Sequence, residues 1–201
     1  MIKKVMFDSL SNNCIFNIRE TLCPEISHAI KNNKDIIIVC VGTDRSTGDS
    51  LGPLVGDKLK FLSRDHVFLY GGLKNPVHAK NLVETIELIK NNHKASYIIA
   101  VDASLGPLQN VGKIVIESKP LLPGAALNKN LPPIGDLYIT GIVNISGSLE
   151  FMVLQNTRLY VVMKIADCIS SGIYHAILKT IGGRKSSCDS YLNNTNLSKI
   201  K

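Results

Sequence analysis

Runs of apolar residues give the first indication of buried strands. The segment DIIIVCVG, residues 35–42, is apolar at every position from 36 to 41 and rich in β-branched side chains. Such a continuous run is typical of a strand that is buried on both faces, as in a parallel sheet. The segment SYIIAVDA, residues 96–103, has the same character. We therefore expect these two strands to be neighbours at the centre of one sheet.

Other segments alternate between strand and helix patterns. Strands are predicted at HVFLYGG, GKIVIES and DLYITGIVNI. Helices are predicted from about 50 to 62, over 75–94 and from about 147 to 181, and a short helix over 23–34 has Pro24 in its first turn. This alternation predicts an α/β fold with three layers, in which helices cover both faces of a mostly parallel sheet.

The chain of 201 residues, 45% of them hydrophobic, is long enough for one sizeable core and short for two. We expect an N-terminal arm, residues 1–33, packed on a single α/β domain, residues 34–183, followed by a polar tail, residues 184–201. The segment 119–135 contains four prolines and two glycines. It is predicted to be a long loop that borders the ligand crevice and moves more than the core.

Composition excludes several classes of protein. No apolar run approaches the roughly 20 residues of a membrane span, and no secretory signal precedes the first strand, so a cytoplasmic protein is expected. Five cysteines without a C-x-x-C spacing argue for reduced thiols rather than a disulfide framework or a zinc site. The net charge of +7 is spread along the chain, so nucleic-acid binding is not expected. No cofactor is expected.

Two aspartates follow the two predicted central strands. Asp49 lies in the turn VGTDRSTGDSLGPL, and Asp102 ends the run YIIAVD. An acid at the position of Asp49 would repel phosphate, so the turn is unlike a P-loop. Because the carboxyl ends of parallel strands meet at one edge of a sheet, both acids are expected at the ligand crevice. Two simpler interpretations stay open: Asp49 as a helix N-cap, and Asp102 as a hydrogen-bonded loop carboxylate.

Two close carboxylates have a definite chemistry. They cannot both ionise easily, so one keeps a proton and acts as an acid while the other acts as a base toward water. That arrangement suits amide hydrolysis. His78 follows the second strand at the start of a predicted helix, where a lone histidine is more often structural. We nevertheless expect His78, Asp44 and Lys129 to contact the substrate.

Several blocks of the sequence, in order, carry a family resemblance: TGDSLGPLVGDKL, NPVHAKNL, VDASLG, PGAALNKNLPPIGDLYITGIVNISG and LQNTRLYVVMKIAD. They resemble the YyaC group of sporulation proteins, which is related to the germination protease of spore-forming bacteria. The resemblance implies a phosphorylase/hydrolase-like α/β fold, shared with hydrogenase maturation proteases. It also implies that Asp49 and Asp102 correspond to the two acids proposed for catalysis in the germination protease.

The resemblance further implies a protein substrate, of which small acid-soluble spore proteins are the example, and a location in the forespore or spore core. One position departs from the hydrogenase maturation proteases, which place a nickel-contacting glutamate where this chain has Ser50. Three alternatives to an aspartate-dependent peptidase therefore stay open. They are a non-catalytic binding or regulatory relative, a metal-sensing peptidase, and a two-carboxylate, one-histidine metal site at Asp49, Asp102 and His78. Assembly into a homo-oligomer is also left open.

Overall fold

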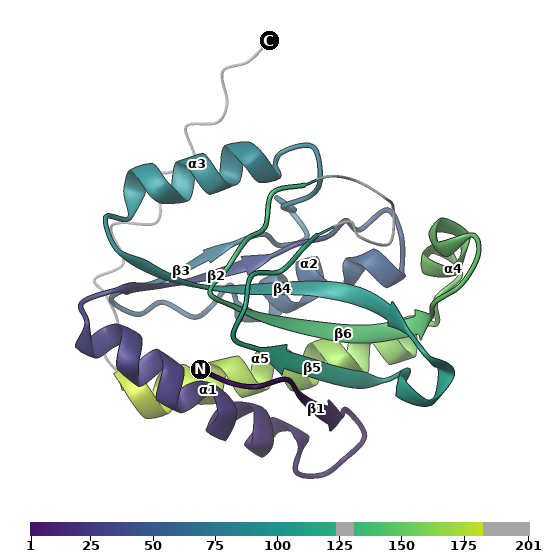
Figure 1. Ribbon diagram of the computed structural model, residues 1–201, viewed down its shortest axis with the longest axis horizontal. Coiled ribbons are helices and arrows are strands. Elements are labelled where there is room, and N and C mark those ends of the chain that lie inside the picture. The colour runs from purple at the N-terminus through teal and green to yellow at the C-terminus, as the bar shows by residue number, and fades with distance from the viewer. Residues whose placement is uncertain (124–130, 183–201) are drawn as a thin grey trace.

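A computed structural model describes residues 1–123 and 131–182. Its centre is a six-stranded sheet in the order β1-β5-β6-β4-β2-β3 (Figure 1). The strands are β1 (Val5–Asp8), β2 (Asp35–Cys40), β3 (Val67–Tyr70), β4 (Ser96–Gly106), β5 (Lys113–Glu117) and β6 (Leu137–Ile145). The helices are α1 (Cys14–Lys31), α2 (Leu51–Leu59), α3 (Leu82–Asn92), α4 (Glu150–Gln155) and α5 (Leu159–Ile181), with short 3-10 turns η1 (Gly48–Ser50) and η2 (Leu108–Asn110).

The sheet is mostly parallel, as predicted. Strand β2 pairs in parallel with β3 and β4, and β4 pairs in parallel with β6. Strand β5 runs antiparallel to both of its neighbours, β1 and β6. The two apolar runs that were expected to be central neighbours form β2 and β4, which are paired and lie inside the sheet. That prediction is confirmed.

Side chains of β2 alternate between two separate apolar clusters. Ile36, Ile38 and Cys40 belong to the cluster that contains α1, α2 and α5. Ile37 and Val39 belong to the cluster on the other face, with Leu82 and Ile89 of α3. Figure 1 shows the resulting layers, with α3 on one side of the sheet and α1 and α5 on the other. The predicted three-layer α/β fold is therefore confirmed.

The first 33 residues differ from their predicted secondary structure. They form the edge strand β1, which was not predicted, and an 18-residue helix α1 that starts nine residues before Cys23, at Cys14. Pro24 lies inside this helix rather than in its first turn. Buried apolar residues repeat every fourth position through the helix, at Cys14, Ile18, Leu22 and Ile26, so packing against the core outweighs the hydrogen bond that proline removes.

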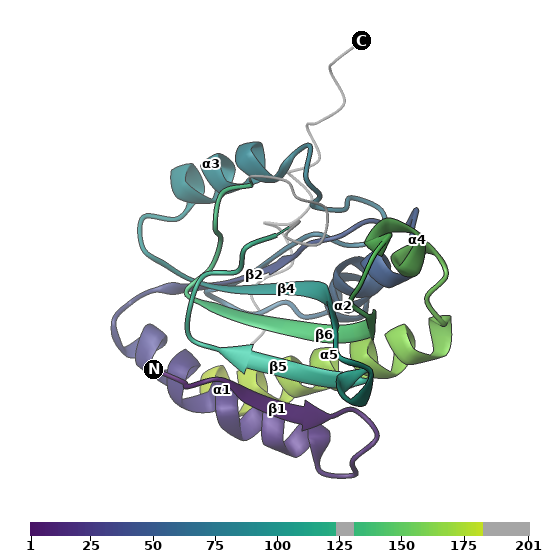
Figure 2. The ribbon, with the colours of Figure 1, turned by 45° about the vertical axis from the view of Figure 1, so that its right-hand side comes forward.

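The predicted C-terminal helix is two helices in the structure. Helix α4 ends at Gln155 and α5 starts at Leu159, and Figure 2 shows α4 near the carboxyl end of β6. Helix α5 is long and apolar enough to cross a membrane by length and composition alone. It packs, however, against α1, α2 and β6, and ten of its residues are buried in the protein. We therefore describe it as a core helix. The predicted tail, residues 184–201, lies outside the described residues.

Candidate active site

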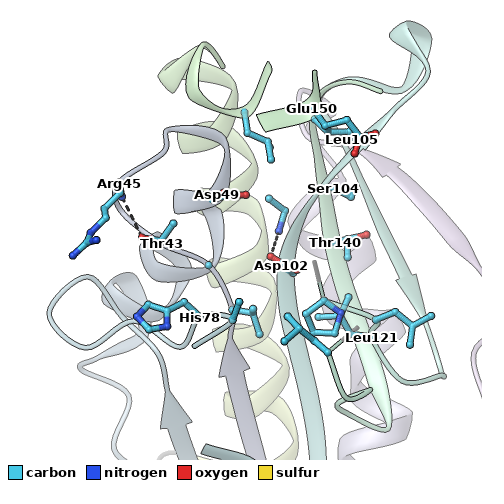
Figure 3. Close-up of a pocket in the computed structure, with 18 of the residues that line it drawn as sticks. Thr43, Arg45, Asp49, His78, Asp102, Ser104, Leu105, Leu121, Thr140 and Glu150 are labelled. Atoms are coloured by element: carbon cyan, nitrogen blue, oxygen red, sulfur yellow. Dashed lines mark hydrogen bonds between the residues drawn. The ribbon is translucent and has the colours of Figure 1, made fainter. Parts of the chain in front are cut away.

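A cavity of about 620 Å³ opens at the carboxyl ends of the parallel strands. Its wall combines the turn after β2, the loop before α3, the ends of β4 and β6, and part of α4 (Figure 3). The polar and charged residues that line it are Thr43, Arg45, Asp49, His78, Lys80, Asp102, Ser104, Thr140 and Glu150. A parallel sheet places its ligand crevice at this edge, so the position agrees with the fold.

Asp102 lies inside β4 rather than after it. The pairing of β2 with β4 ends at Cys40 and Val101, so Asp102 is the first residue of β4 beyond the end of β2. On its other side β4 continues to pair with β6, and Asp102 lies opposite Thr140. The Asp102 Oδ1 atom accepts a hydrogen bond of 2.8 Å from the Ala103 backbone N–H (Figure 3). A rigid strand therefore holds this carboxyl group at the pocket wall.

Asp49 is brought to the pocket by a tight turn. The chain leaves β2 through Gly42, whose N–H donates to the Val77 carbonyl at 2.8 Å and whose φ is +142°. A Cβ atom on Gly42 would lie 2.1 Å from the Asp49 carbonyl oxygen, and the Thr43 N–H donates to that same oxygen at 3.1 Å. Only glycine permits so close an approach. The turn thus returns Asp49 to the end of β2.

The predicted N-cap role of Asp49 does not match this geometry. Asp49 is the middle residue of η1, and the N-cap residue of α2 is Ser50. Among the described residues, neither η1 nor α2 has a side-chain hydrogen bond at its cap. A role for Asp49 in the pocket, rather than at the helix end, is consistent with this position.

Burial and a neighbouring charge shift the titration of Asp102. Burial, opposed by the hydrogen bond from Ala103 and assisted by the charge of Asp49, raises the pKa of Asp102 from its usual 3.8 to about 8. At neutral pH the Asp102 carboxyl is therefore largely protonated. The contribution of Asp49 shows that the two acids are close enough to interact electrostatically.

Of the three residues that were expected to contact the substrate, the structure places one in the pocket wall. His78 lines the pocket, on the side of Thr43 and Arg45 (Figure 3). Its buried Nδ1 atom has no hydrogen-bond partner among residues 1–123 and 131–182. Its backbone N–H is held by Asn81 Oδ1 at 2.8 Å, and it lies in the loop before α3 rather than in the helix. Asp44 is exposed and does not line the pocket. Lys129 lies outside the described residues.

Several lining residues were not identified from the sequence. Thr140 is 8% exposed and lies on β6, directly across from Asp102. Ser104 lies two residues after Asp102, and its hydroxyl donates to the Gly141 carbonyl at 3.3 Å. Glu150 comes from α4, ten residues after Thr140. Their positions depend on strand register and on the placement of α4, and the spacing of motifs along the chain gives neither.

One part of the pocket wall is apolar. Leu121, Leu122, Pro123 and Leu131 come from the described parts of the predicted long loop, so the prediction that this loop borders the crevice is confirmed for them. Leu105 of β4 and Leu154 of α4 complete this wall. The pocket therefore offers an apolar surface beside a pair of acids, a combination that can receive an apolar group of a ligand next to polar chemistry.

The pocket does not fit the metal sites considered from the sequence. Among the described residues, no three histidine, cysteine, aspartate or glutamate side chains come together as a metal-binding group. Asp49, Asp102 and His78 line one pocket but do not converge as a ligand set. Ser50 is 7% exposed, and its hydroxyl donates to the Thr47 carbonyl at 2.6 Å. It is therefore engaged in the turn and offers no carboxylate at the position of the expected glutamate.

Comparison with known proteins identifies relatives of this chain. A family model described as "Protein of unknown function (DUF1256)" matches residues 6–172. The "Uncharacterized protein YyaC" of Bacillus subtilis (strain 168) is 53% identical over 140 residues, which are 70% of this chain and 68% of that protein. A NiFe hydrogenase maturation protease, HycI from Thermococcus kodakarensis KOD1, is similar in structure with a TM-score of 0.48 and 19% identity, over 77% of this chain and 99% of that one. The resemblance noted in the sequence is thereby confirmed, and the chain belongs to the DUF1256 family, together with YyaC.

Proposed function

We propose that this protein is a peptidase in which Asp49 and Asp102 act together on a water molecule. The observation that supports this proposal most strongly is the pair itself, which lines one pocket and in which the pKa of Asp102 is raised to about 8. A carboxyl group kept neutral beside a second acid is the arrangement that assigns one residue as acid and the other as base.

The proposed chemistry follows from this division. Asp49 accepts a proton from water as the oxygen attacks the peptide carbonyl carbon. Protonated Asp102 donates to the carbonyl oxygen and stabilises the tetrahedral intermediate. When the C–N bond breaks, the proton held by Asp49 passes to the leaving nitrogen, and the carbonyl oxygen returns its proton to Asp102. Each acid regains its starting state, so no cofactor is required.

The proposed substrate is a protein segment that enters the pocket in an extended form. The apolar wall at Leu105, Leu121 and Leu154 would receive one side chain of that segment. The resemblance to the germination protease makes small acid-soluble spore proteins the first substrates to test, with the forespore or spore core as the proposed location.

A second function, binding without cleavage, is compatible with the same pocket. A regulatory relative would keep the crevice and its apolar wall, whereas its acids would serve only to orient a bound segment. The two functions differ in one observable: a peptidase creates new chain ends, and a binding module does not.

The test uses purified full-length protein incubated with small acid-soluble spore proteins, with mass spectrometry to detect new termini. The proposal expects cleavage by the wild type and a loss of about 100-fold or more in Asp102→Asn and in Asp49→Asn. Asp44→Asn is the matched control, because it removes one charge from the same turn outside the pocket. Binding by the wild type without cleavage supports the regulatory function, and cleavage that survives in Asp102→Asn refutes the proposed mechanism.

A further inference from the structure

Two cysteines from opposite ends of the chain meet inside the core. Cys14 is the first residue of α1 and is 1% exposed, and Cys168 lies in the middle of α5 and is 7% exposed. The Cys168 thiol donates to the Ser9 carbonyl at 3.3 Å, in the turn that leads into α1, and both cysteines belong to the same apolar cluster. Neither cysteine lines the acidic pocket.

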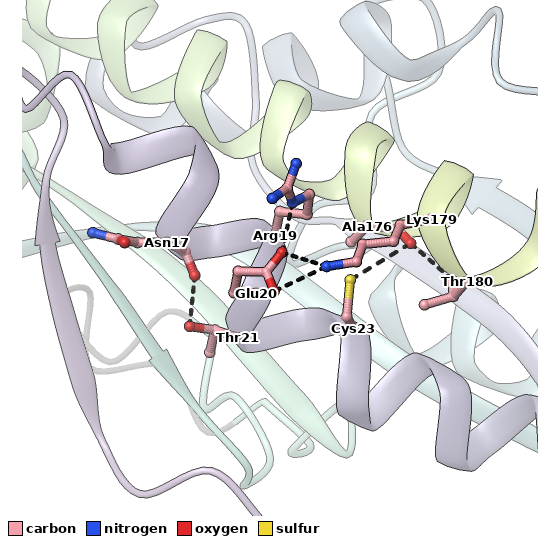
Figure 4. A network of polar contacts seen from close by, with 8 residues as sticks. All are labelled: Asn17, Arg19, Glu20, Thr21, Cys23, Ala176, Lys179 and Thr180. Atoms are coloured by element: carbon pink, nitrogen blue, oxygen red, sulfur yellow. Dashed lines mark hydrogen bonds and ion pairs between the residues drawn. The ribbon is translucent and has the colours of Figure 1, made fainter.

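The packing of α1 on α5 explains why these thiols are adjacent. One turn after each cysteine, Ile18 of α1 faces Gly172 of α5, where a Cβ atom would lie only 2.4 Å from Ile18 Cγ2. Further along, the Cys23 thiol lies 4.0 Å from the Ala176 carbonyl oxygen, and Lys179 Nζ pairs with Glu20 at 2.8 Å (Figure 4). The helices therefore run side by side in the same direction, with Cys14 and Cys168 at the start of their contact.

The close packing of α1 on α5 favours a cross-link between these two cysteines. A disulfide needs Cα atoms within about 7 Å and Cβ atoms that point toward each other. Large side chains at a helix–helix contact usually keep the two helices too far apart for a disulfide. Gly172, one turn after Cys168, has no side chain, so α1 can approach α5 closely at this point. The contact of Ile18 with Gly172 and that of Cys168 with Ser9 hold the start of α1 close to α5, so little backbone movement is required.

We propose that Cys14 and Cys168 form a redox-sensitive cysteine pair, in which a hydroperoxide converts the two thiols into a disulfide that links α1 to α5. The proposal is independent of peptidase activity. It assigns a role to two buried nucleophiles that the pocket chemistry does not use.

Hydrogen peroxide is the oxidant in the proposed reaction. One cysteine, as the thiolate, attacks a peroxide oxygen, which breaks the O–O bond, releases hydroxide and leaves a sulfenic acid. The second thiolate then attacks the sulfenic sulfur, forms the S–S bond and displaces hydroxide, which takes up a proton. In total, two thiols and one hydrogen peroxide give one disulfide and two waters, with the sulfur atoms oxidised and the peroxide reduced.

Cys168 is the proposed first nucleophile. Interaction with the Cys14 thiol, which outweighs burial and the charge of Asp167, lowers the pKa of the Cys168 thiol, whereas the same interaction, with burial, raises the pKa of Cys14. The thiols are covered by the turn between β1 and α1, in which Leu10 to Asn13 are exposed. Local opening of this turn would admit a peroxide without unfolding the sheet.

The test treats folded, full-length wild-type protein with hydrogen peroxide. After quenching, thiols that remain free are alkylated in denaturant, the protein is reduced, and newly released thiols receive a second, heavier label. Peptide mapping is expected to find the second label on Cys14 and Cys168 in equal yield and, without reduction, a peptide that joins the two. Because the disulfide closes a loop of more than 100 residues, the equilibrium population of unfolded protein should fall about 30-fold or more, and a reductant should reverse the effect.

Matched variants make the test specific. Cys14→Ser and Cys168→Ser should each abolish the cross-linked peptide and the stabilisation, whereas Cys23→Ser, which alters another cysteine of α1 at the α5 interface, should abolish neither. The wild-type peptide map needs no variant, so a poorly folded variant cannot hide the answer. The proposal is overturned if Cys14 and Cys168 keep the first label in peroxide-treated protein, if either pairs with another cysteine, or if the cross-link forms only in denaturant.

Discussion

The substitution Asp102→Asn should make the protein more stable at neutral pH while removing the proposed acid. Asparagine keeps the shape of the side chain and an oxygen that can accept the 2.8 Å hydrogen bond from Ala103. It carries no charge at any pH, so folding no longer requires proton uptake by a carboxyl group that is ionised in the unfolded chain. Catalytic residues often lower the stability of the folded protein, and Asp102 is expected to do so.

The size and sign of the effect follow from proton linkage. The pKa of Asp102 in the folded protein is about 8, against a usual value of 3.8. Between these two pH values the folded state holds a proton that the unfolded state has released, so wild-type stability falls as pH rises, by about 1.4 kcal/mol per pH unit. At pH 7 the accumulated loss is about 4 kcal/mol, which is an upper limit because water in the pocket screens the charge. Below about pH 4 the loss is absent.

The assay is urea unfolding of wild type and variant from pH 4 to pH 9. The free energies of unfolding should agree near pH 4 and diverge as pH rises, with Asp102→Asn the more stable. The exposed residue Asp44 again provides the control, since Asp44→Asn removes one charge outside the pocket and should stay within about 0.5 kcal/mol of wild type throughout. If Asp102→Asn were less stable than wild type at pH 7, or if the two curves ran parallel, the carboxyl would be ionised in the folded protein and the reasoning would be wrong.

Three further substitutions test other parts of the structure. Gly52→Ala should cost about 3 kcal/mol or more in urea unfolding, because the new Cβ atom would lie 1.9 Å from the Val41 carbonyl oxygen, whereas Gly72→Ala, whose nearest neighbour lies at 3.8 Å, should change stability little. Asp35→Asn should cost about 1 to 3 kcal/mol at pH 7, because Asp35 accepts hydrogen bonds from His66 and His93 at 2.8 and 2.9 Å. Burial raises the pKa of Asp35, but the two histidines lower it by more, so this difference should start to shrink as the pH falls below about 4 and end only below the lowered pKa of the folded state. A difference that grows on acidification would contradict the assignment. Asp49→Asn should lower the pKa of Asp102, because the charge of Asp49 raises it. In urea unfolding, the fall of stability with rising pH should therefore end at a lower pH in this variant than in the wild type.

The central strands could be predicted because their signal is local. Strand β2 from Ile36 to Cys40 and strand β4 from Tyr97 to Val101 are continuous apolar runs, and such runs are typical of strands inside a covered sheet. The break between α4 and α5 depends on contacts with the neighbouring strand β6, which the helical periodicity of the segment does not reveal. Asn144 of β6 donates to the Val153 carbonyl at 3.3 Å and to the Thr157 hydroxyl at 3.2 Å, which holds the end of α4 in place.

The site could be predicted only in part for a similar reason. Asp49 and Asp102 were identified because each follows an apolar run, and strand ends collect at one edge of a parallel sheet. Thr140 faces Asp102 only because β6 is the neighbour of β4, an order that the chain does not reveal. Asp44 was expected to contact the substrate, but its side chain is exposed and does not line the pocket.

The position of the acid pair depends on backbone contacts more than on the acids themselves. Gly42 lies against the Asp49 carbonyl, and Gly52 lies against the Val41 carbonyl, so the turn and the start of α2 are fixed directly on the end of β2. Asp102 is fixed independently, by β4 and its pairing with β6. These contacts use main-chain atoms and glycines, and they remain when either carboxyl group is replaced. The asparagine variants should therefore keep the pocket while changing its charge, so that a loss of cleavage in them reports on chemistry rather than on folding.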